Sequence, residues 1–236
     1  MSDDDTFLTT VRTHIENLYR TCEITAPSIQ RAITPLGELI GSFNLVCMEL
    51  PELTQYRAMD FLAQQGGVVD LSETLDREPL AGYLYANTHH GCIFVERDDF
   101  LVRRRFSIAH ELGHYFLHFQ PLLLAAEQNQ HYLSMSESLH PDKGLSDESS
   151  ASISIIGTPQ GQPNLPPSAQ MEREANQFAA ELLMPVEVVQ GLLARAFVYR
   201  SEADVVTRLA TTMLVSEESM RIRLKNLGLW PLPEKR

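Results

Sequence analysis

Apolar residues recur at helical spacing in the first quarter of the chain. In residues 6–21 they form the single stripe that an amphipathic helix buries. This stripe consists of Phe7, Leu8, Val11, Ile15 and Leu18. The same spacing continues over residues 29–48, and residues 51–65 predict a further helix with a proline in its first turn and two glycines after its end. We therefore predict a helical segment over residues 1–66.

The pattern then changes to one that is typical of strands. Residues 80–85 and 91–96 are short runs rich in aromatic and β-branched side chains, and the turn-prone sequence Ala-Asn-Thr-His-His lies between them. We predict an antiparallel hairpin here. Residues 106–119 form an apolar, helix-compatible stretch, and Pro121 lies just past its expected end.

The rest of the chain consists of one polar stretch followed by helices. Residues 127–170 are rich in Ser, Gln, Asn, Pro and Gly, so we predict that part of this stretch lacks regular structure. Helical spacing resumes over residues 171–184, breaks at Pro185 and continues over residues 186–198. Two further short helices are expected within residues 203–229.

Charge and composition narrow the functional classes. The 236 residues carry a formal net charge of −12 and are 44% hydrophobic, so a core can form, while an acidic surface repels the phosphate backbone of nucleic acids. The three cysteines are far apart and form neither a disulfide framework nor a paired-cysteine metal site. The acidic start differs from a secretory signal, and no apolar run approaches the roughly 20 residues that span a bilayer. We expect a soluble, cytoplasmic protein without a membrane partner.

The sequence His-Glu-Leu-Gly-His at residues 110–114 carries the clearest chemistry. On a helix, His110 and His114 lie about one turn apart on the same face, where two imidazoles can bind one Zn²⁺ at about 2.0–2.1 Å. Glu111 can then reach a metal-bound water without being a ligand, which is the arrangement of the HExxH motif. The surrounding helix is apolar, and burial of such polar groups is costly unless they are used. We predict a metal site here, and we expect His118 to lie beyond it, near the last carbonyls of the helix.

A third ligand must come from elsewhere, because a catalytic zinc ion keeps three protein ligands and one open position. The candidates that follow the motif are His131, His140, Glu172, Glu174 and Glu181. The two histidines lie in the polar stretch, which is a poor place for a rigid ligand. Glu172 and Asn176 are four residues apart on a predicted helix, so they can place a carboxylate on the metal and an amide against a ligand histidine. Glu174 lies about 200° around that helix and is expected to be solvated, and a solvent-facing position is equally open to Glu181.

Two segments of the chain resemble the ImmA/IrrE-type metallopeptidases. One is the Arg-Arg-Arg-Phe-Ser-Ile-Ala-His-Glu-Leu-Gly-His-Tyr sequence of residues 103–115, and the other is Glu-Arg-Glu-Ala-Asn-Gln-Phe-Ala-Ala-Glu-Leu-Leu-Met-Pro at residues 172–185. The predicted hairpin, with Gly82 in its first strand, fits as well. The segment between the two motifs, residues 121–169, is longer than expected for this family.

The resemblance implies a gluzincin-like zinc site, in which two histidines and a glutamate on a following helix hold the metal. This supports Glu172 as the third ligand. The resemblance also implies a typical role, which is the cleavage of a partner transcriptional repressor of the helix-turn-helix type.

We therefore expect an α+β, zincin-like fold, in which a small, mostly antiparallel sheet packs on the HExxH helix between N- and C-terminal helices. Residues 1–66 are expected to form the N-terminal helical segment of the catalytic domain. Residues 67–198 are expected to form the zinc peptidase core, with a flexible insertion at about 121–169. Residues 199–236 are expected to form a C-terminal helical subdomain that resembles a helix-turn-helix.

The expected reaction is hydrolysis of a peptide bond with one Zn²⁺ per chain, or Mn²⁺ as an alternative metal in cells. His110, His114 and Glu172 hold the ion, Asn176 supports a ligand histidine, and Glu111 takes the water proton and passes it to the leaving amine. The residue that stabilises the oxyanion is left open. Its candidates are Tyr83, Tyr85, Tyr132, Arg103, Arg104 and Arg105.

Two other functional classes fit parts of the sequence. Residues 203–228 have helix-turn-helix character, with Arg221, Arg223 and Lys225 on the second helix. Two glutamates occupy the first turn of that helix, where base-reading side chains would lie, so direct nucleic-acid binding is not favoured. The other class is a non-catalytic regulator that uses the same fold as a sensor, and the intact Glu111 argues against it. An adjacent gene for a small helix-turn-helix repressor would favour the protease.

Overall fold

The computed structural model describes residues 3–66, 75–129, 133–140, 154–156, 165–195 and 201–231. The chain forms two compact units. Residues 40–176 make up one of them, which we call the sheet unit, and residues 1–39 with 177–236 make up the helical unit. The domain boundaries predicted at residues 66 and 198 stay predictions.

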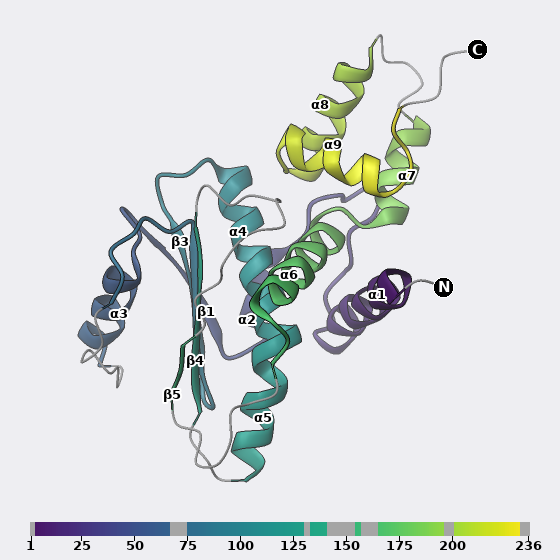
Figure 1. Ribbon diagram of the computed structural model, residues 1–236. Helices are drawn as coiled ribbons and strands as arrows, with labels where there is room; N and C mark the ends of the chain where they lie inside the picture. The colour runs from purple at the N-terminus through teal and green to yellow at the C-terminus, as the bar shows by residue number, and fades with distance from the viewer. Residues whose placement is uncertain are drawn as a thin grey trace. The chain divides into compact units, whose positions relative to one another are not determined.

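The sheet unit is built on five strands in the spatial order β1-β3-β2-β4-β5 (Figure 1). These strands are β1 (Leu45–Leu50), β2 (Gly82–Asn87), β3 (Gly91–Glu96), β4 (Ser134–Leu139) and β5 (Ser154–Ile156). Strand β1 runs parallel to β3, and the other three pairings are antiparallel. The predicted hairpin is confirmed as β2 and β3. Its turn is closed by the side chain of Asn87, which accepts hydrogen bonds from the backbone N–H groups of His89 and His90.

The two faces of this sheet pack against different helices (Figure 1). Tyr83, Tyr85 and Phe94 share one face, and they pack in one hydrophobic cluster with residues of α3 (Gln55–Gln64). The opposite face carries α4 (Leu101–His114), which contacts β2 and β3. Since side chains alternate between the faces of a strand, the residues of β2 that face α4 are Gly82, Leu84 and Ala86. The fold is therefore α+β with a small mixed sheet, which is compatible with a zincin-like architecture.

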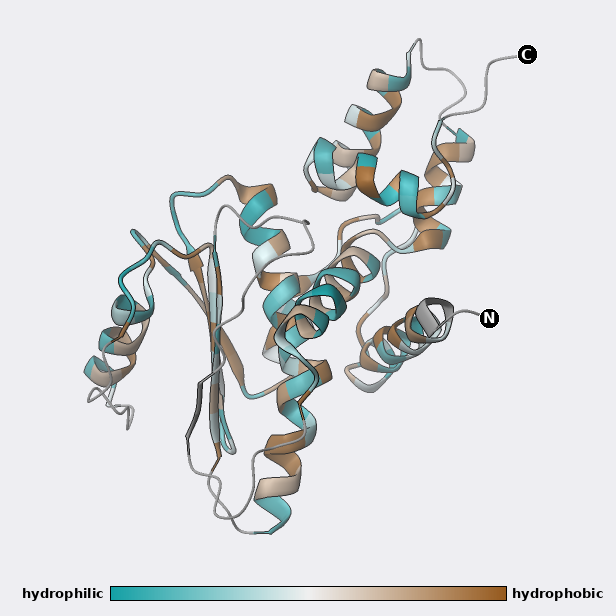
Figure 2. Ribbon diagram, in the orientation of Figure 1, coloured by the Kyte–Doolittle hydropathy of each residue, from teal (hydrophilic) through white to brown (hydrophobic). Residues whose placement is uncertain are grey.

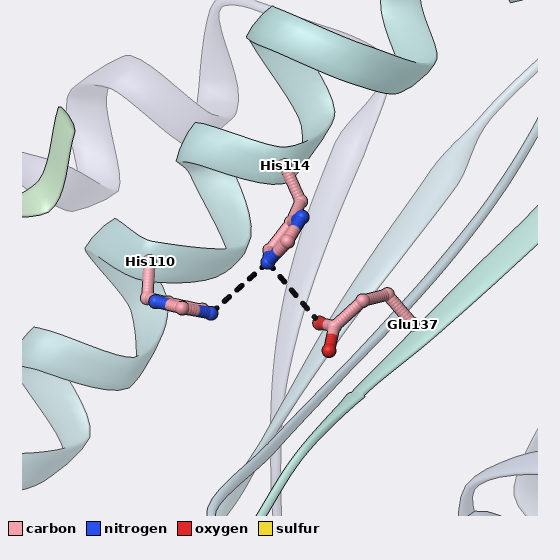
Figure 3. Close-up of side chains that lie close together, drawn as sticks. All are labelled: His110, His114 and Glu137. Atoms are coloured by element: carbon pink, nitrogen blue, oxygen red, sulfur yellow. Dashed lines mark hydrogen bonds and ion pairs between the residues drawn. The ribbon is translucent and has the colours of Figure 1, made fainter. Parts of the chain in front are cut away.

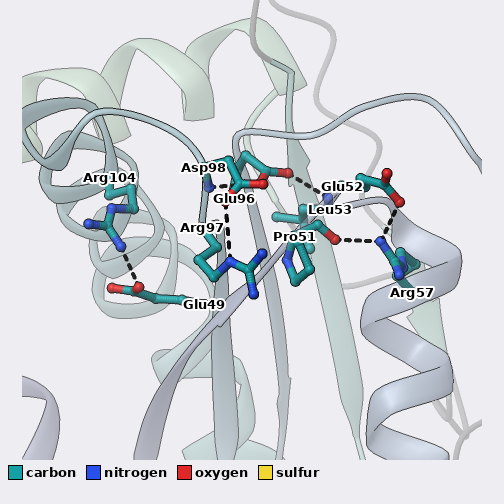
Figure 4. A network of polar contacts seen from close by, with 9 residues as sticks. All are labelled: Glu49, Pro51, Glu52, Leu53, Arg57, Glu96, Arg97, Asp98 and Arg104. Carbon is teal, nitrogen blue, oxygen red and sulfur yellow. Dashed lines mark hydrogen bonds and ion pairs between the residues drawn. The ribbon is translucent and has the colours of Figure 1, made fainter.

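Polar contacts hold the end of the sheet from which α4 begins (Figure 4). Glu96, the last residue of β3, accepts hydrogen bonds from the backbone N–H groups of Leu53 at 2.6 Å and Asp98 at 3.0 Å. Arg104, in the first turn of α4, pairs with Glu49 of β1. These contacts tie the loops that follow β1 and β3 to the start of α4, so they fix where the helix enters the sheet face.

The prediction of a helix over residues 29–48 was wrong. The apolar pattern there is divided between the short helix α2 (Leu36–Gly41) and strand β1. Strand β1 pairs along its whole length with β3, from Leu45 opposite Gly91 to Leu50 opposite Glu96. Tertiary pairing with a buried strand thus overrides a helical spacing that is carried mainly by the residues of α2.

The expected helix end near Pro121 was also wrong. Helix α4 continues through a π-helical turn, Tyr115–Phe119, into α5 (Gln120–Gln128). Pro121 lies in the first turn of α5, where a missing N–H costs little. Of the polar residues 127–170, the structure describes the end of α5, strands β4 and β5, and the start of α6 (Ser168–Leu183). Much of the stretch that we predicted to lack regular structure lies outside the described residues.

The helical unit confirms the helices predicted near both ends of the chain. They are α1 (Asp3–Thr21), the second half of α6, α7 (Val186–Arg195), α8 (Glu202–Met213) and α9 (Glu217–Asn226). Hydrophobic and hydrophilic residues alternate along α8 (Figure 2), as expected for a helix with one buried face. Ser201 and Ser216 cap α8 and α9 by accepting hydrogen bonds from backbone N–H groups. No single helix in the described ranges is long and apolar enough to cross a membrane, although α6 and α7, bent by 47°, pass that test as a pair.

Candidate metal centre

The HExxH segment lies in the buried last turn and a half of α4. His110, Glu111 and His114 are each 0% exposed. The Glu111 side chain lies against β2 at Gly82, where an added Cβ would lie 2.5 Å from Oε1 of Glu111. A side chain at that position would displace the Glu111 carboxylate, so a glycine in β2 is what lets this carboxylate lie against the sheet.

The two histidine rings present the same nitrogen to one point. Nε2 of His110 and Nε2 of His114 are 3.0 Å apart. Nδ1 of His110 lies 3.0 Å from Oδ1 of Asn176 on α6. An amide oxygen only accepts, so Nδ1 of His110 donates and its Nε2 keeps a lone pair. The arrangement places two nitrogen donors side by side, one helical turn apart, as the spacing predicts.

Two carboxylates lie next to these nitrogens. Oxygens of Glu172 on α6 lie 3.1 Å from Nε2 of His114 and 3.5 Å from Nε2 of His110. Glu137, in the middle of β4, places Oε2 3.8 Å from Nε2 of His114 (Figure 3). One ligand atom from each of His110, His114 and Glu137 lies within 4.8 Å of the others, so this group could hold a metal ion. The site therefore offers two imidazoles and two carboxylates.

A third histidine, His118, contacts the His114 ring on the side opposite its Nε2 atom. Nδ1 of His118 lies 3.2 Å from Nδ1 of His114, and Nε2 of His118 lies 3.0 Å from a carboxylate oxygen of Glu174. Gln170 donates to the other oxygen of Glu174 at 2.8 Å. His118 was expected near the last carbonyls of a helix, but the helix continues past it through the π-helical turn and His118 is buried. Glu174 was expected to be solvated, but His118 and Gln170 hold it.

Burial sets the charge state of the cluster. It lowers the pKa of His110 to about 3 and the pKa of His114 well below its usual value, so both rings are neutral donors near pH 7. Burial, together with the neighbouring carboxylates, raises the pKa of Glu111 and of Glu137 above their usual values. Within the described parts of the chain, neither glutamate forms an ion pair with lysine or arginine. Neutral imidazoles beside buried, mutually repelling carboxylates fit a divalent cation.

The other sequence candidates lie elsewhere or outside the described residues. Glu181 belongs to the helical unit, where it pairs with Arg12 and Arg223. His140 lies just after β4 and is not in the metal-binding group found among the described residues. His131 and Tyr132 lie outside the described residues.

The structure also narrows the candidates for an oxyanion donor. Tyr83 and Tyr85 are on the α3 face of the sheet, away from α4. Arg103 pairs with Asp99 at 3.3 Å, and Arg104 pairs with Glu49. None of these four side chains is placed at the histidines by a contact in the described structure.

Glu137 is the residue that the sequence interpretation missed. It lies in a stretch that was interpreted as a polar insertion. A signal was present, because Ser134-Met135-Ser136-Glu137-Ser138-Leu139 alternates between serine and larger side chains. In a strand this alternation puts Met135, Glu137 and Leu139 on one face, which marks Glu137 as the charged member of an otherwise apolar face.

Comparison with known proteins agrees with the geometry. No curated protein matches the chain. The model of one protein family, described as the IrrE N-terminal-like domain, matches residues 63–140 and 148–225. The match includes α4 and β4, which carry His110, His114 and Glu137, and α6, which carries Glu172. It also includes α7, α8 and most of α9. The chain belongs to the IrrE N-terminal-like domain family of peptidases.

Proposed function

We propose that this protein is a zinc-dependent metallopeptidase in which His110, His114 and Glu172 hold the ion and Glu111 transfers protons. The observation that carries the proposal is the convergence of two neutral imidazole nitrogens, 3.0 Å apart, with buried carboxylates on one point beside the helix. Bound zinc would supply an acidified water and a polarised substrate carbonyl. Mn²⁺ is the alternative metal in cells.

Two carboxylates compete for the role of third ligand, and we assign it to Glu172. Its oxygens are nearer to both histidine nitrogens, at 3.1 and 3.5 Å, than Glu137 is to His114, at 3.8 Å. The helix that carries Glu172 also carries Asn176, which orients His110. One rigid element thus provides a ligand and the support of another ligand, which is how metal sites are commonly held.

Glu111 is assigned to proton transfer because of where α4 and β2 hold it. It follows the first histidine of the motif, and its Oε1 lies against the backbone of Gly82 rather than against the histidine nitrogens. From there its carboxylate can accept a proton from an attacking water and deliver it to the leaving amine. His110, His114 and Glu172 would hold the metal and transfer no proton in this scheme.

The proposed substrate is a helix-turn-helix transcriptional repressor, which rests on the family resemblance. The test is incubation of the protein with candidate repressors and Zn²⁺ or Mn²⁺, followed by mass spectrometry of the fragments. Cleavage by the wild-type protein, with none by the Glu111→Gln variant, is the expected result. Equal cleavage by both proteins would contradict the mechanism and favour a contaminating protease or a different site.

The alternative of direct DNA binding through residues 203–228 receives no support from the side chains of α9. Arg223 is buried, and its guanidinium donates to both carboxylate oxygens of Glu181 and to the carbonyl of Met184. Arg221 pairs with Glu217 at 2.7 Å. Two of the three basic side chains that suggested a recognition helix are therefore engaged within the protein itself.

A further inference from the structure

Strand β4 lies between the two motifs, within the first range that the family model matches, and it covers the edge of β2. The two strands pair antiparallel along all of β2, from Gly82 opposite Leu139 to Asn87 opposite Ser134. All six residues of β4 are buried. Without β4, strand β2 would be an open edge next to Glu111, because a Cβ added at Gly82 of β2 would lie 2.5 Å from Oε1 of that carboxylate.

The same strand delivers a carboxylate to the metal centre. Glu137 lies opposite Leu84, so its side chain shares the face of the sheet that packs on α4. Its Oε2 reaches to 3.8 Å from Nε2 of His114 (Figure 3). A slip of one residue would turn Glu137 to the opposite face. The register of β4 thus decides whether the centre has three protein donors or four.

A centre with four protein donors differs in function from one with three. Catalytic zinc sites keep one position open for water or substrate, whereas sites closed by four protein ligands are structural. Extended peptides also commonly bind by adding a strand to an exposed sheet edge. Strand β4 occupies the edge of β2, and Glu137 adds a carboxylate beside the two histidines.

We propose that β4 is a built-in inhibitory strand: Glu137 fills the open metal position, and the strand takes the edge of β2 that a substrate segment would use. The inference rests on the proposed function and adds its regulation. Activity then requires β4 to leave β2, which frees the coordination position and the sheet edge in one step.

The composition of β4 suits a strand that can be displaced. Ser134, Ser136 and Ser138 fill one of its faces, so the side chains of that face bury little apolar surface. Among the described residues, its outer neighbour β5 pairs with Ser134–Ser136, at the end of β4 away from Gly82.

The test uses Glu137→Gln, which keeps the size of the side chain and weakens it as a ligand, in the full-length protein loaded with Co²⁺. Ser138→Ala, on the same strand but on the opposite face, is the matched control. Acetohydroxamate binds a metal only where a position is open, so its titration, followed by the Co²⁺ absorption bands, measures closure without any substrate. Since minor conformations are commonly populated at about 0.1–10%, the variant should bind acetohydroxamate about 10-fold more tightly or better. The control should behave like the wild type.

Cleavage of casein, as a generic unfolded substrate, gives an independent reading. Glu137→Gln should cleave it about 10-fold faster than the wild type or better, and adding Glu111→Gln should remove the gain. Equal acetohydroxamate affinity in variant and wild type would overturn the inhibitory strand. So would loss of the metal in Glu137→Gln, which would make Glu137 an obligatory ligand. Tighter acetohydroxamate binding without cleavage of casein or of any candidate repressor would keep the closing strand and instead contradict the proposed peptidase function.

Discussion

Buried carboxylates lie in different surroundings in the two units of this chain. In the helical unit, Glu181 is 2% exposed and its carboxylate accepts hydrogen bonds from Arg223, at 2.7 and 2.9 Å, and from Arg12, at 2.9 and 3.1 Å. In the sheet unit, Glu111 and Glu137 are each 0% exposed and neither has an arginine or lysine partner among the described residues.

The pKa values of these carboxyls shift in opposite directions in the two units. Burial acts to raise the pKa of Glu181, but the hydrogen bonds and charges of Arg223 and Arg12 outweigh it and leave the pKa below its usual value. Burial and neighbouring carboxylates raise the pKa of Glu111 and Glu137. Burial alone therefore does not mark a functional site. The informative feature is a group of buried carboxyls without a protein cation, next to neutral imidazoles, because a bound divalent cation would stabilise their charged form.

The largest expected effect is a loss of cleavage activity when the metal centre of the sheet unit is changed. Glu111→Gln removes the proton acceptor and one of the repelling charges, so the variant should fold, bind zinc and lose about 10²–10⁴-fold in cleavage rate. His114→Ala should instead lose metal and activity together. The activity is measured as the rate of repressor cleavage, and the bound metal is measured as zinc content by mass spectrometry. If Glu111→Gln cleaves at the normal rate, the proton-transfer role is wrong.

The next largest effect is a loss of stability when Glu181 of the helical unit is changed. Glu181→Ala leaves the buried Arg223 without its carboxylate, so the free energy of unfolding should fall by about 3–5 kcal/mol, as for other broken buried pairs. Urea unfolding measures it, and the zinc content of the folded fraction should not change. Glu217→Ala, which removes an exposed partner of Arg221, is the control and should leave stability nearly unchanged. A small loss for Glu181→Ala would mean that the two clusters do not differ in structural role.

Zinc should stabilise the folded protein only by binding to the metal centre of the sheet unit. At a free zinc concentration of 100 times Kd, binding to the folded state alone adds about 2.7 kcal/mol to the free energy of unfolding. Urea unfolding with and without zinc should show this gain in the wild-type protein and in Glu217→Ala, and none in His114→Ala. An equal gain in His114→Ala would place the bound metal outside the described cluster.

The smallest effect concerns the support of the histidines. One ring nitrogen of His118 contacts His114 and the other contacts Glu174. His118 therefore fixes the orientation of the His114 ring. His118→Ala should weaken zinc binding about 10–100-fold, the usual cost of losing such a partner, measured by competition with a chelator. His118→Gln should recover part of the loss. No change in affinity would show that His118 only packs.

Residues that act within one helical turn were predictable from the sequence. The spacing of His110 and His114, and of Glu172 and Asn176, depends only on helix geometry. Strand β1 was not predictable in the same way, because its conformation comes from pairing with β3, as Leu45 does with Gly91. A local spacing carries no information about so distant a partner.

The same reason explains the missed parts of the metal centre. Glu137 reaches His114 only through the pairing of β4 with β2. The contact of His118 with Glu174 joins residues 56 positions apart on two helices, and the π-helical turn that carries His118 has no spacing signal of its own. Helical periodicity therefore located the motif, and tertiary pairing supplied the remaining neighbours.

The central claim is that the buried carboxylates of the sheet unit are completed by one divalent ion. The most direct measurement is zinc stoichiometry and affinity of the full-length protein by chelator competition, for the wild type, His114→Ala and Glu181→Ala. We predict one zinc per chain in the wild type and in folded Glu181→Ala, and no tightly bound zinc in His114→Ala. Unchanged zinc binding by His114→Ala would contradict the account.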